Sequence, residues 1–392
     1  MPTDRVTESL LLPELRLVDS SFEHDGEIEL DVDKTSAFEV CPKCATPSRS
    51  VYDHRVVSIH DAPVRSRQVR LRVRKRRFSC RPCGKPFTEP VGGIRKGARH
   101  TERYRKSVLW ACENFSSLKD VRRAYRCSSG FLYTTLYAEL ERRRRTRIYP
   151  WPKVVGIDEH FFRRENGFPR FVSVLVDYKG RRVMELVNGR SGPELEAALA
   201  LIPGRENVRY VVLDLSDPFK RFTQSFFPNA QLVADKFHVL RLLNPAINRY
   251  RKAITGDRRS LPIRRLLLRS GHRLHHAERY AVERWLELYP QLQELYLCKE
   301  ALHRFYRTRG FDRAAEALTW LTDQMARSAI PEIQTLRRTL MRWRREVLAY
   351  FKSGLTNGRT EGFNNKAKLV KKRAYGYRSF ENYRLRLLNA CA

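Results

Sequence analysis

The sequence predicts a mixed α/β domain that is preceded by a cysteine-rich β-ribbon and a helix-turn-helix region. Two C-x-x-C pairs lie within the first 90 residues, helical periodicity fills residues 101–145, and strands alternate with helices after residue 153. Such alternation is typical of α/β folds. We therefore divide the 392 residues into an N-terminal region 1–90, a region 91–150 and a domain 151–392.

The composition indicates a polyanionic partner. Lysine and arginine together number 77, against 43 aspartates and glutamates, which is a formal net charge of +34. This excess would repel itself strongly without a counterion, and nucleic acid is the natural one. An anionic membrane surface is the alternative, but no apolar run approaches a bilayer span and the basic residues form no single amphipathic face. The N-terminal segment MPTDRVTESLLLPELRL lacks a signal-peptide pattern, so we expect a cytoplasmic protein.

The cysteine pairs predict a structural zinc site. Cys41 and Cys44 form one C-x-x-C turn, and Cys80 and Cys83 form the second. Each turn can direct two thiolates at one tetrahedral ion, so the two turns can close a zinc ribbon around a single Zn²⁺. Four buried thiols without a metal are the alternative. Residues 56–80 alternate apolar and basic side chains, which predicts strands with a cationic face that contacts DNA.

The other histidines and cysteines carry a weaker signal. His54 and His60 could replace cysteine ligands, although single histidines on strands are more often ordinary polar residues. The remaining cysteines have no partner spacing, and we expect a structural role for Cys112, Cys127, Cys298 and Cys391.

Residues 118–142 have the outline of a helix-turn-helix. A helix at 118–123, a turn at 125–128 and a helix at 129–142 would place the second helix in the major groove of DNA. Any two short amphipathic helices give a similar pattern, so the DNA-binding role depends on the surrounding positive charge. The basic, proline-containing stretch ERRRRTRIYPWP then marks a domain boundary.

The following domain combines a three-stranded meander with alternating helix and strand. The strands are predicted in KVVGIDEHFF, FPRFVSVLVDYKG, RRVMELVNGR, VRYVVLDLSDPF and QLVADK, and a helix in SGPELEAALALI. Asp158 and Asp214 come at or near the ends of strands that can be neighbours. Buried carboxylates are costly without a cation and repel each other, so the pair indicates Mg²⁺ or Mn²⁺. A helix cap and a loop acid are the alternative.

Residues from about 251 to 350 are helical and rich in arginine and leucine, which predicts an all-helical insertion. Its apolar residues recur at helical spacing, and we expect three tryptophans in its core, Trp285, Trp320 and Trp343. After the insertion, a turn at 357–358 leads into a helix that carries Glu361 near its start. Glu361 is the one acid among six basic residues between 356 and 373.

Four blocks of the chain resemble the ISL3 family of bacterial insertion-sequence transposases. Three look like its catalytic blocks: VVGIDEHFF, VVLDLSDPFKRFTQSFFPNAQLVADKFHVL and TNGRTEGFNNKAKLVKKRAYGYRSFENYRLRLL. The fourth, CPKC with CRPCGKPFTEP, looks like its zinc-binding region. The blocks follow the family's order and cover nearly the whole chain. The resemblance implies an RNase H-like catalytic domain with an aspartate-aspartate-glutamate (DDE) triad and a helical insertion before the glutamate.

Carried over by position, the triad is Asp158, Asp214 and Glu361. The resemblance implies that these carboxylates bind two Mg²⁺ or Mn²⁺ ions and that the protein cuts and joins DNA by phosphoryl transfer. The basic residues near the glutamate would then face DNA phosphates: Arg359, Lys366, Lys368, Lys371, Lys372 and Arg373. The implied partners are the terminal inverted repeats of the element, a target DNA, and further copies of the chain in a dimer or larger synaptic complex. The implied setting is the bacterial nucleoid.

Two assignments have alternatives. Asp217 lies three residues after Asp214 and could be the ligand instead, although Asp214 directly ends the strand. Asp235 and His238 lie on one face of a helix start and resemble a D-x-x-H element of related transposases, which supports the active site or the DNA. An N-cap aspartate and a partly buried histidine would explain them equally well.

Two other functions fit parts of the sequence. A DNA-binding regulator could use the ribbon and the helix-turn-helix with an inert catalytic domain, although a decayed copy would be expected to lose one of the three acids. Another nuclease of the same fold, such as a resolvase, would need the carboxylates but not the first 150 residues devoted to DNA recognition.

Overall fold

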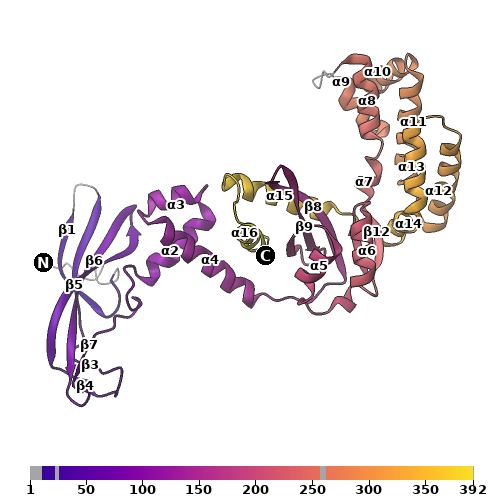
Figure 1. Ribbon diagram of the computed structural model, residues 1–392. Helices are drawn as coiled ribbons and strands as arrows, with labels where there is room; N and C mark the ends of the chain where they lie inside the picture. The colour runs from indigo at the N-terminus through magenta and orange to yellow at the C-terminus, as the bar shows by residue number, and fades with distance from the viewer. Residues whose placement is uncertain (1–10, 23–25, 257–261, 392) are drawn as a thin grey trace. The chain divides into compact units, whose positions relative to one another are not determined.

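The computed structural model of the protein describes residues 11–22, 26–256 and 262–391 (Figure 1). The chain divides into two compact units, Met1–Arg142 and Arg143–Ala392. Each unit contains its own hydrophobic core.

A five-stranded sheet dominates the first unit. Its strand order is β1-β2-β6-β5, β7 pairs with β6, and a separate two-stranded sheet, β3-β4, flanks the first cysteine turn. The strands are β1 (Leu15–Phe22), β2 (Glu27–Lys34), β3 (Glu39–Val40), β4 (Pro47–Ser48), β5 (Val51–Val64), β6 (Arg67–Cys80) and β7 (Lys85–Thr88). Alternation along β5 and β6 directs Ile59, Leu71 and Val73 into the core, where all three are fully buried.

β2 brings acids against the arginines of β6. The parallel register pairs Glu29 with Arg70 and Asp31 with Arg72. Arg70 Nη2 lies 2.8 Å from Glu27 Oε1, and Arg72 Nη1 lies 3.4 Å from Asp31 Oδ2. These cross-strand ion pairs engage Arg70 and Arg72 of the cationic face that the alternating sequence of β6 predicts. The sequence does not reveal the pairing, since the acids lie about 40 residues earlier in the chain.

Three helices follow this sheet, α2 (Glu102–Asn114), α3 (Leu118–Ala124) and α4 (Ser129–Thr146). The Thr101 and Ser117 side chains accept hydrogen bonds from main-chain N–H groups in the first turns of α2 and α3, which explains where these helices begin. α3 and α4 begin at the expected residues. α4 runs beyond residue 142 because its arginines favour helix and the next proline is Pro150.

The sheet of the second unit has the order β10-β9-β8-β11-β12. The meander β8-β9-β10 is antiparallel, whereas β11 runs parallel to both β8 and β12. The strands are β8 (Val154–Glu165), β9 (Phe168–Asp177), β10 (Arg182–Asn188), β11 (Tyr210–Leu213) and β12 (Gln231–Ala234). This is the predicted series of three meander strands followed by two more, with helices between the later strands.

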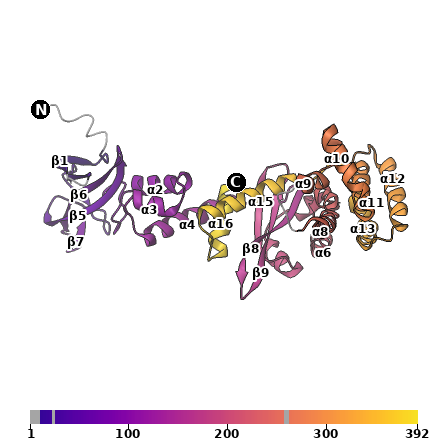
Figure 2. The same ribbon diagram turned by 90° about the horizontal axis from the view of Figure 1, so that it is seen from above.

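The two faces of this sheet pack against different helices. Ile157 and Leu175 belong to a core shared with α5 (Gly192–Leu199) and α6 (Asp217–Phe226). Val174 and Val176 belong to a second core shared with α15 (Gly358–Arg373) and α16 (Phe380–Ala390). Figure 2 shows α15 lying along the sheet beside β8. The sheet is therefore the middle layer, and α15 covers the face that also carries Asp158, which is opposite Val174 in the ladder.

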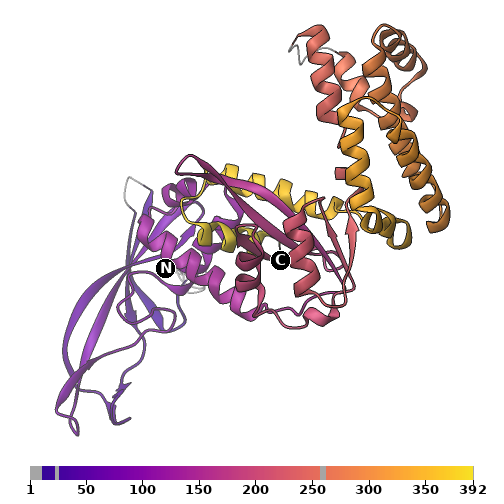
Figure 3. The ribbon, with the colours of Figure 1, turned by 45° about the vertical axis from the view of Figure 1, so that its right-hand side comes forward.

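The described parts of the segment between β12 and α15 are helical (Figure 3). Its α-helices are α7 (Lys236–Leu240), α8 (Asn244–Thr255), α9 (Pro262–Leu268), α10 (His276–Glu287), α11 (Pro290–Phe305), α12 (Phe311–Ala326), α13 (Pro331–Arg342) and α14 (Arg344–Ser353). Trp343 is fully buried and Trp285 is partly buried, but Trp320 is 59% exposed. The prediction for Trp320 was wrong, because it lies off the buried stripe that runs along α12 through Leu318 and Leu321. No helix in the described segments is long and apolar enough to cross a bilayer.

Candidate active site

Three aspartates form a row across adjacent strands of the second unit. β11 runs parallel to β8, and the last pair of their register is Val212 opposite Gly156. Two residues further along both strands, Asp214 comes beside Asp158. Asp235 directly follows β12, the strand on the other side of β11. Because residues at matching positions of neighbouring strands face the same side of a sheet, the three carboxylates lie on one face.

The sequence placed Asp158 at or near the end of its strand. In the structure, Asp158 lies within β8. β8 continues to Glu165 in a hairpin with β9, but its pairing with β11 stops at Gly156. A strand can leave one neighbour while it keeps the other, and the alternation of apolar residues does not reveal this. Asp158 therefore lies where the sheet opens between β8 and β11, with only 8% of the residue exposed.

His238 lies between two of the acids. Its Nδ1 atom is 2.7 Å from Asp214 Oδ1 and 2.9 Å from Asp235 Oδ2. Burial alone would lower the pKa of His238, but its contacts with the carboxylates of Asp214 and Asp235 outweigh the effect of burial and raise the pKa to about 10. A single N–H group makes one good hydrogen bond, and Asp214 Oδ1 has no hydrogen-bond partner among the described residues. The imidazolium therefore supplies positive charge to both carboxylates.

The electrostatics of the row fit a divalent cation. Burial raises the pKa of Asp158 to about 7, and the negative charge of Asp214 adds to this rise. Carboxylates that oppose each other's ionisation are arranged to receive a positive charge. One ligand atom from each of Asp214, Asp235 and His238 lies within 4.8 Å of the others. Carboxylate oxygens suit Mg²⁺ or Mn²⁺, so Asp214 and Asp235 of this cluster could hold such an ion, whereas His238 in its imidazolium form has no lone pair to offer it.

Two asparagines of the α15 segment contact the row, and the sequence assigned a role to neither. The Asn357 main-chain N–H donates to Asp235 Oδ1 at 2.9 Å, and its side-chain amide donates to the carbonyl of Ile157 at 3.1 Å. Asn364 Nδ2 donates to Asp158 Oδ2 at 2.6 Å. Their spacing of seven residues, about two helical turns, returns to the same face of a helix and is the signal that could have found them.

Glu361 lies in the first turn of α15, four residues after Asn357 and three before Asn364. These spacings put it on the side of the helix that faces the aspartate row. Its side chain is exposed, and within the described parts of the chain no contact joins it to Asp158 or Asp214. The structure thus brings the two aspartates together and leaves the glutamate at the edge of the site.

Asp217, the alternative to Asp214, lies at the first position of α6. Its Oδ2 atom lies 3.3 Å from Arg342 Nη1, so an ion pair already engages its carboxylate. Asp217 is not in the cluster that Asp214 forms with Asp235 and His238.

The basic residues of α15 fall into two groups. Arg359 donates to the carbonyl of Tyr178 and stacks its guanidinium over the ring of that tyrosine. Lys371 donates to the carbonyls of Phe161 and Phe162, and burial lowers its pKa. The other four are exposed: Lys366, Lys368, Lys372 and Arg373. Hydrogen bonds to main-chain carbonyls outside α15 thus engage Arg359 and Lys371.

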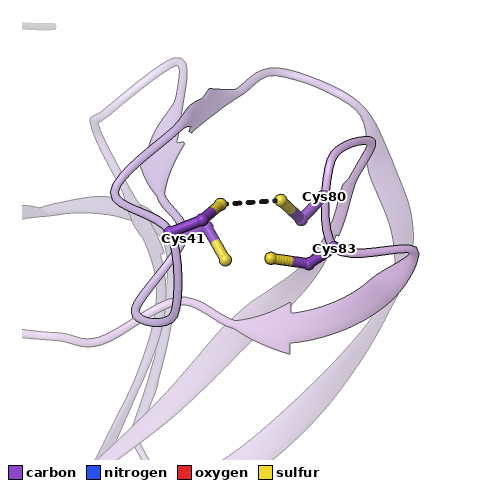
Figure 4. Close-up of side chains that lie close together, drawn as sticks. Cys41, Cys80 and Cys83 are labelled. Carbon is purple, nitrogen blue, oxygen red and sulfur yellow. Dashed lines mark hydrogen bonds between the residues drawn. The ribbon is translucent and has the colours of Figure 1, made fainter.

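The four cysteines of the C-x-x-C turns form one group in the first unit. Their Sγ atoms all lie within 4.8 Å of one another, and Cys44 Sγ is 3.4 Å from Cys80 Sγ. Figure 4 shows the sulfur atoms of Cys41, Cys80 and Cys83 pointing toward a common centre. Hydrogen bonds, first from Thr46 and then from the neighbouring thiols, lower the pKa of Cys44 to about 6. The group could hold a zinc ion in the tetrahedral arrangement of a structural site.

The two histidines near this group lie outside it. His54 Nε2 forms a 2.8 Å hydrogen bond with Arg74 Nη2. The His60 ring packs near the ring of Tyr104, with centroids 5.9 Å apart. Both act as ordinary polar residues of the strand.

Comparison with known proteins assigns the family. Residues 155–387 match the ISL3 family model, described as a transposase, and residues 37–83 match the model for the zinc finger of the transposases IS204, IS1001, IS1096 and IS1165. The transposase of insertion sequence IS1001 from Bordetella parapertussis is 26% identical over 365 residues, which cover 90% of this chain and 89% of the relative. The transposase of IS1557 from Mycobacterium tuberculosis is 25% identical over 346 residues, 80% of this chain and 76% of the relative. The chain belongs to the ISL3 family of transposases.

Proposed function

We propose that this protein is a DDE transposase that binds the terminal inverted repeats of its insertion sequence and catalyses metal-dependent cleavage and strand transfer of DNA. The observation that supports it most directly is the row of aspartates across β8, β11 and β12, in which burial and the neighbouring charge of Asp214 raise the pKa of Asp158. The three antiparallel strands followed by two parallel ones, with helices on both faces, support an RNase H-like catalytic fold.

The catalytic metal ligands would be Asp158, Asp214 and Glu361, holding two Mg²⁺ or Mn²⁺ ions. Ions at such a site activate a water or a 3′-hydroxyl and stabilise the leaving oxygen of a phosphodiester. Glu361 would complete this set from the first turn of α15, three residues before Asn364 on the same helix face. Asp235 and His238 would support the site, since His238 shares its Nδ1 between Asp235 and Asp214.

The DNA contacts would come from both units. Lys366, Lys368, Lys372 and Arg373 project from α15 and would face phosphates beside the reacting bond, with Arg359 and Lys371 holding the helix to the sheet. α4 would read the major groove as the second helix of a helix-turn-helix, and the zinc ribbon would stiffen the region before it. Synapsis of two element ends calls for a dimer or larger assembly, working at the bacterial nucleoid.

A DNA-binding regulator without cleavage activity is the second candidate. The observation in its favour is that Glu361, the third acid of the proposed triad, is exposed, whereas Asp158 is buried and Asp214 is half-buried.

The deciding experiment is cleavage of a labelled duplex that carries the element's end, with Mg²⁺ or Mn²⁺ against EDTA. Wild type, Asp158→Asn and Glu361→Gln are compared, with electrophoretic binding to the same duplex measured in parallel. The transposase proposal expects metal-dependent nicking at the element boundary by wild type, and binding without nicking by both variants. Full cleavage by either variant would remove that residue from the triad, and binding without cleavage by all three would favour the regulator.

A further inference from the structure

α15 is attached to β8 by polar contacts that recur every seven residues. Asn357 donates to the carbonyl of Ile157 at 3.1 Å, and Lys371 donates to that of Phe162 at 2.6 Å. Asn364, midway between them, donates instead to a side chain, the carboxylate of Asp158. The two outer contacts bind the helix to the main chain of the strand. The middle contact touches the group that the proposed reaction uses.

The Asp158 carboxylate is held at both oxygens. Oδ1 accepts the main-chain N–H of Glu159 at 2.7 Å, and Oδ2 accepts the Asn364 amide at 2.6 Å. One donor on each oxygen fixes the rotation of the carboxylate and leaves further lone pairs free. The donor from Asn364 is neutral, so it orients the carboxylate without cancelling the charge that a metal ion requires. A lysine or arginine at this position would compete with the metal.

A second layer of polar side chains lies behind Asn364. The Tyr383 hydroxyl, fully buried on α16, forms a 2.6 Å hydrogen bond with His160 Nε2, and His160 in turn interacts with Asn364. Two polar atoms of these side chains, His160 Nδ1 and Asn364 Oδ1, are both buried and have no hydrogen-bond partner in the described residues. A proton on Nδ1 would pair them and would fix the amide with its nitrogen toward Asp158. His160 lies two residues from Asp158 and faces the same side of β8.

We propose that Asn364 is a positioning residue of the active site, which orients the Asp158 carboxylate for a divalent metal ion and is itself oriented by His160 and Tyr383. This inference deepens the proposed function, on which it rests. It also explains how the helix that carries Glu361 is aligned with the aspartate row, since Asn364 lies three residues after Glu361 on the same helix face. Metal-orienting partners of this kind typically change metal affinity or activity about 10- to 100-fold when they are removed.

The test uses the full-length protein with its zinc site loaded, and Mn²⁺ alone as the probe. Binding is followed by the electron paramagnetic resonance signal of free Mn²⁺ for wild type, Asn364→Ala and Asn364→Ser. The serine variant keeps the site small and polar, but its hydroxyl is too short to reach Asp158. Asn365→Ala is the matched control, because Asn365 is exposed and adjacent on the same helix. Thermal unfolding of every variant reports whether the fold is kept.

We expect both Asn364 variants to bind Mn²⁺ about 10- to 100-fold more weakly, with unfolding midpoints near that of wild type and no change for Asn365→Ala. Tyr383→Phe, which removes one oxygen behind His160, should show a smaller loss in the same direction. Wild-type Mn²⁺ affinity in Asn364→Ala would overturn the proposal, and so would a loss of binding that appears only together with loss of folding in both variants.

This outcome is separable from that of the proposed function. If wild type binds Mn²⁺ but does not cut the element's end, the transposition chemistry fails, while the comparison of Mn²⁺ affinities still decides the role of Asn364. If wild type cuts DNA and Asn364→Ala cuts equally well at limiting Mn²⁺, the function stands and the positioning role fails.

Discussion

The ammonium group of Lys371 donates a 2.6 Å hydrogen bond to the main-chain carbonyl of Phe162, and a second, of 2.8 Å, to that of Phe161. Both carbonyls lie in β8, beyond the region where this strand pairs with β11. Lys368, one turn earlier on the same helix, is exposed, and its ammonium reaches only Asn365 Oδ1 at 3.5 Å. Lys371 therefore binds α15 to β8, whereas the Lys368 side chain remains exposed to solvent.

Replacement of these lysines should separate DNA binding from stability. Lys368→Ala should weaken DNA binding and reduce the slope of log affinity against log salt by about 1, because one phosphate contact is lost. Lys371→Ala should change the salt slope less but lower the free energy of unfolding by about 1–3 kcal/mol, since two carbonyls lose a charged donor. Fluorescence anisotropy at several salt concentrations and chemical denaturation measure the two quantities. Equal salt slopes for both variants would contradict this assignment.

His238→Ala should reduce cleavage about 10- to 100-fold while DNA binding is kept. The His238 imidazolium lies between the carboxylates of Asp214 and Asp235, and without its positive charge the two carboxylates repel each other. Single-turnover cleavage over a range of Mg²⁺ concentrations measures the effect, with exposed His276→Ala as the control. Unchanged cleavage by His238→Ala would show that His238 does not support the active site.

Elemental analysis of the purified protein should find about one zinc per chain, as expected of a four-cysteine site. Cys41→Ser should lower this content sharply and destabilise the first unit, since the metal holds two separate turns together. Cys127→Ser, which alters a cysteine outside the group, should keep the zinc. A wild-type zinc content in Cys41→Ser would show that the four thiols do not act as one site.

The helical insertion should lose stability in mild acid through His303. Burial lowers the pKa of His303 to about 4, against an ordinary value of 6.5. Between these two values the unfolded chain binds more protons than the folded one, so the free energy of unfolding falls as the pH drops from about 6.5 toward 4. Allowing for partial solvent screening, we expect about 1 kcal/mol from this residue. Denaturation of wild type and His303→Gln at pH 7.5 and pH 5 should show a smaller acid loss in the variant, and equal losses would exclude His303 as a source.

Lys299→Met should destabilise the insertion by about 3 kcal/mol. The Lys299 side chain is fully buried and donates to the carbonyls of Leu267 and Arg269, at 2.8 and 2.6 Å, near the end of α9. Methionine keeps the volume but leaves these carbonyls and the Glu300 carboxylate without their cation. Chemical denaturation measures the loss against exposed Arg313→Met, for which we expect a change within about 0.5 kcal/mol. A similar small change for Lys299→Met would contradict the structural role.

Features that depend on neighbours in the chain could be predicted from the sequence. The C-x-x-C turns, the five strands of the second unit, the helices at α3 and α4 and the helical insertion all follow from local spacing and periodicity. The family assignment was also confirmed, because several motifs in a fixed order carry more information than any one of them. The identity of the triad remains a prediction.

Features that depend on distant partners were decided by tertiary packing. Asn364 and Asp158 are 206 residues apart; the seven-residue spacing of Asn357 and Asn364 marks one face of a helix, but it does not reveal that this face meets Asp158. Trp320 has the helical spacing of a core residue, but the buried stripe of α12 passes beside it. The alternating arginines of β6 predict a DNA-binding face, but Arg70 and Arg72 form ion pairs with acids of β2. In each case the periodicity of the sequence defines which residues share one face of a helix or strand. The element that packs against that face decides whether a charged or aromatic side chain is exposed to solvent, pairs with another residue or lies in the active site.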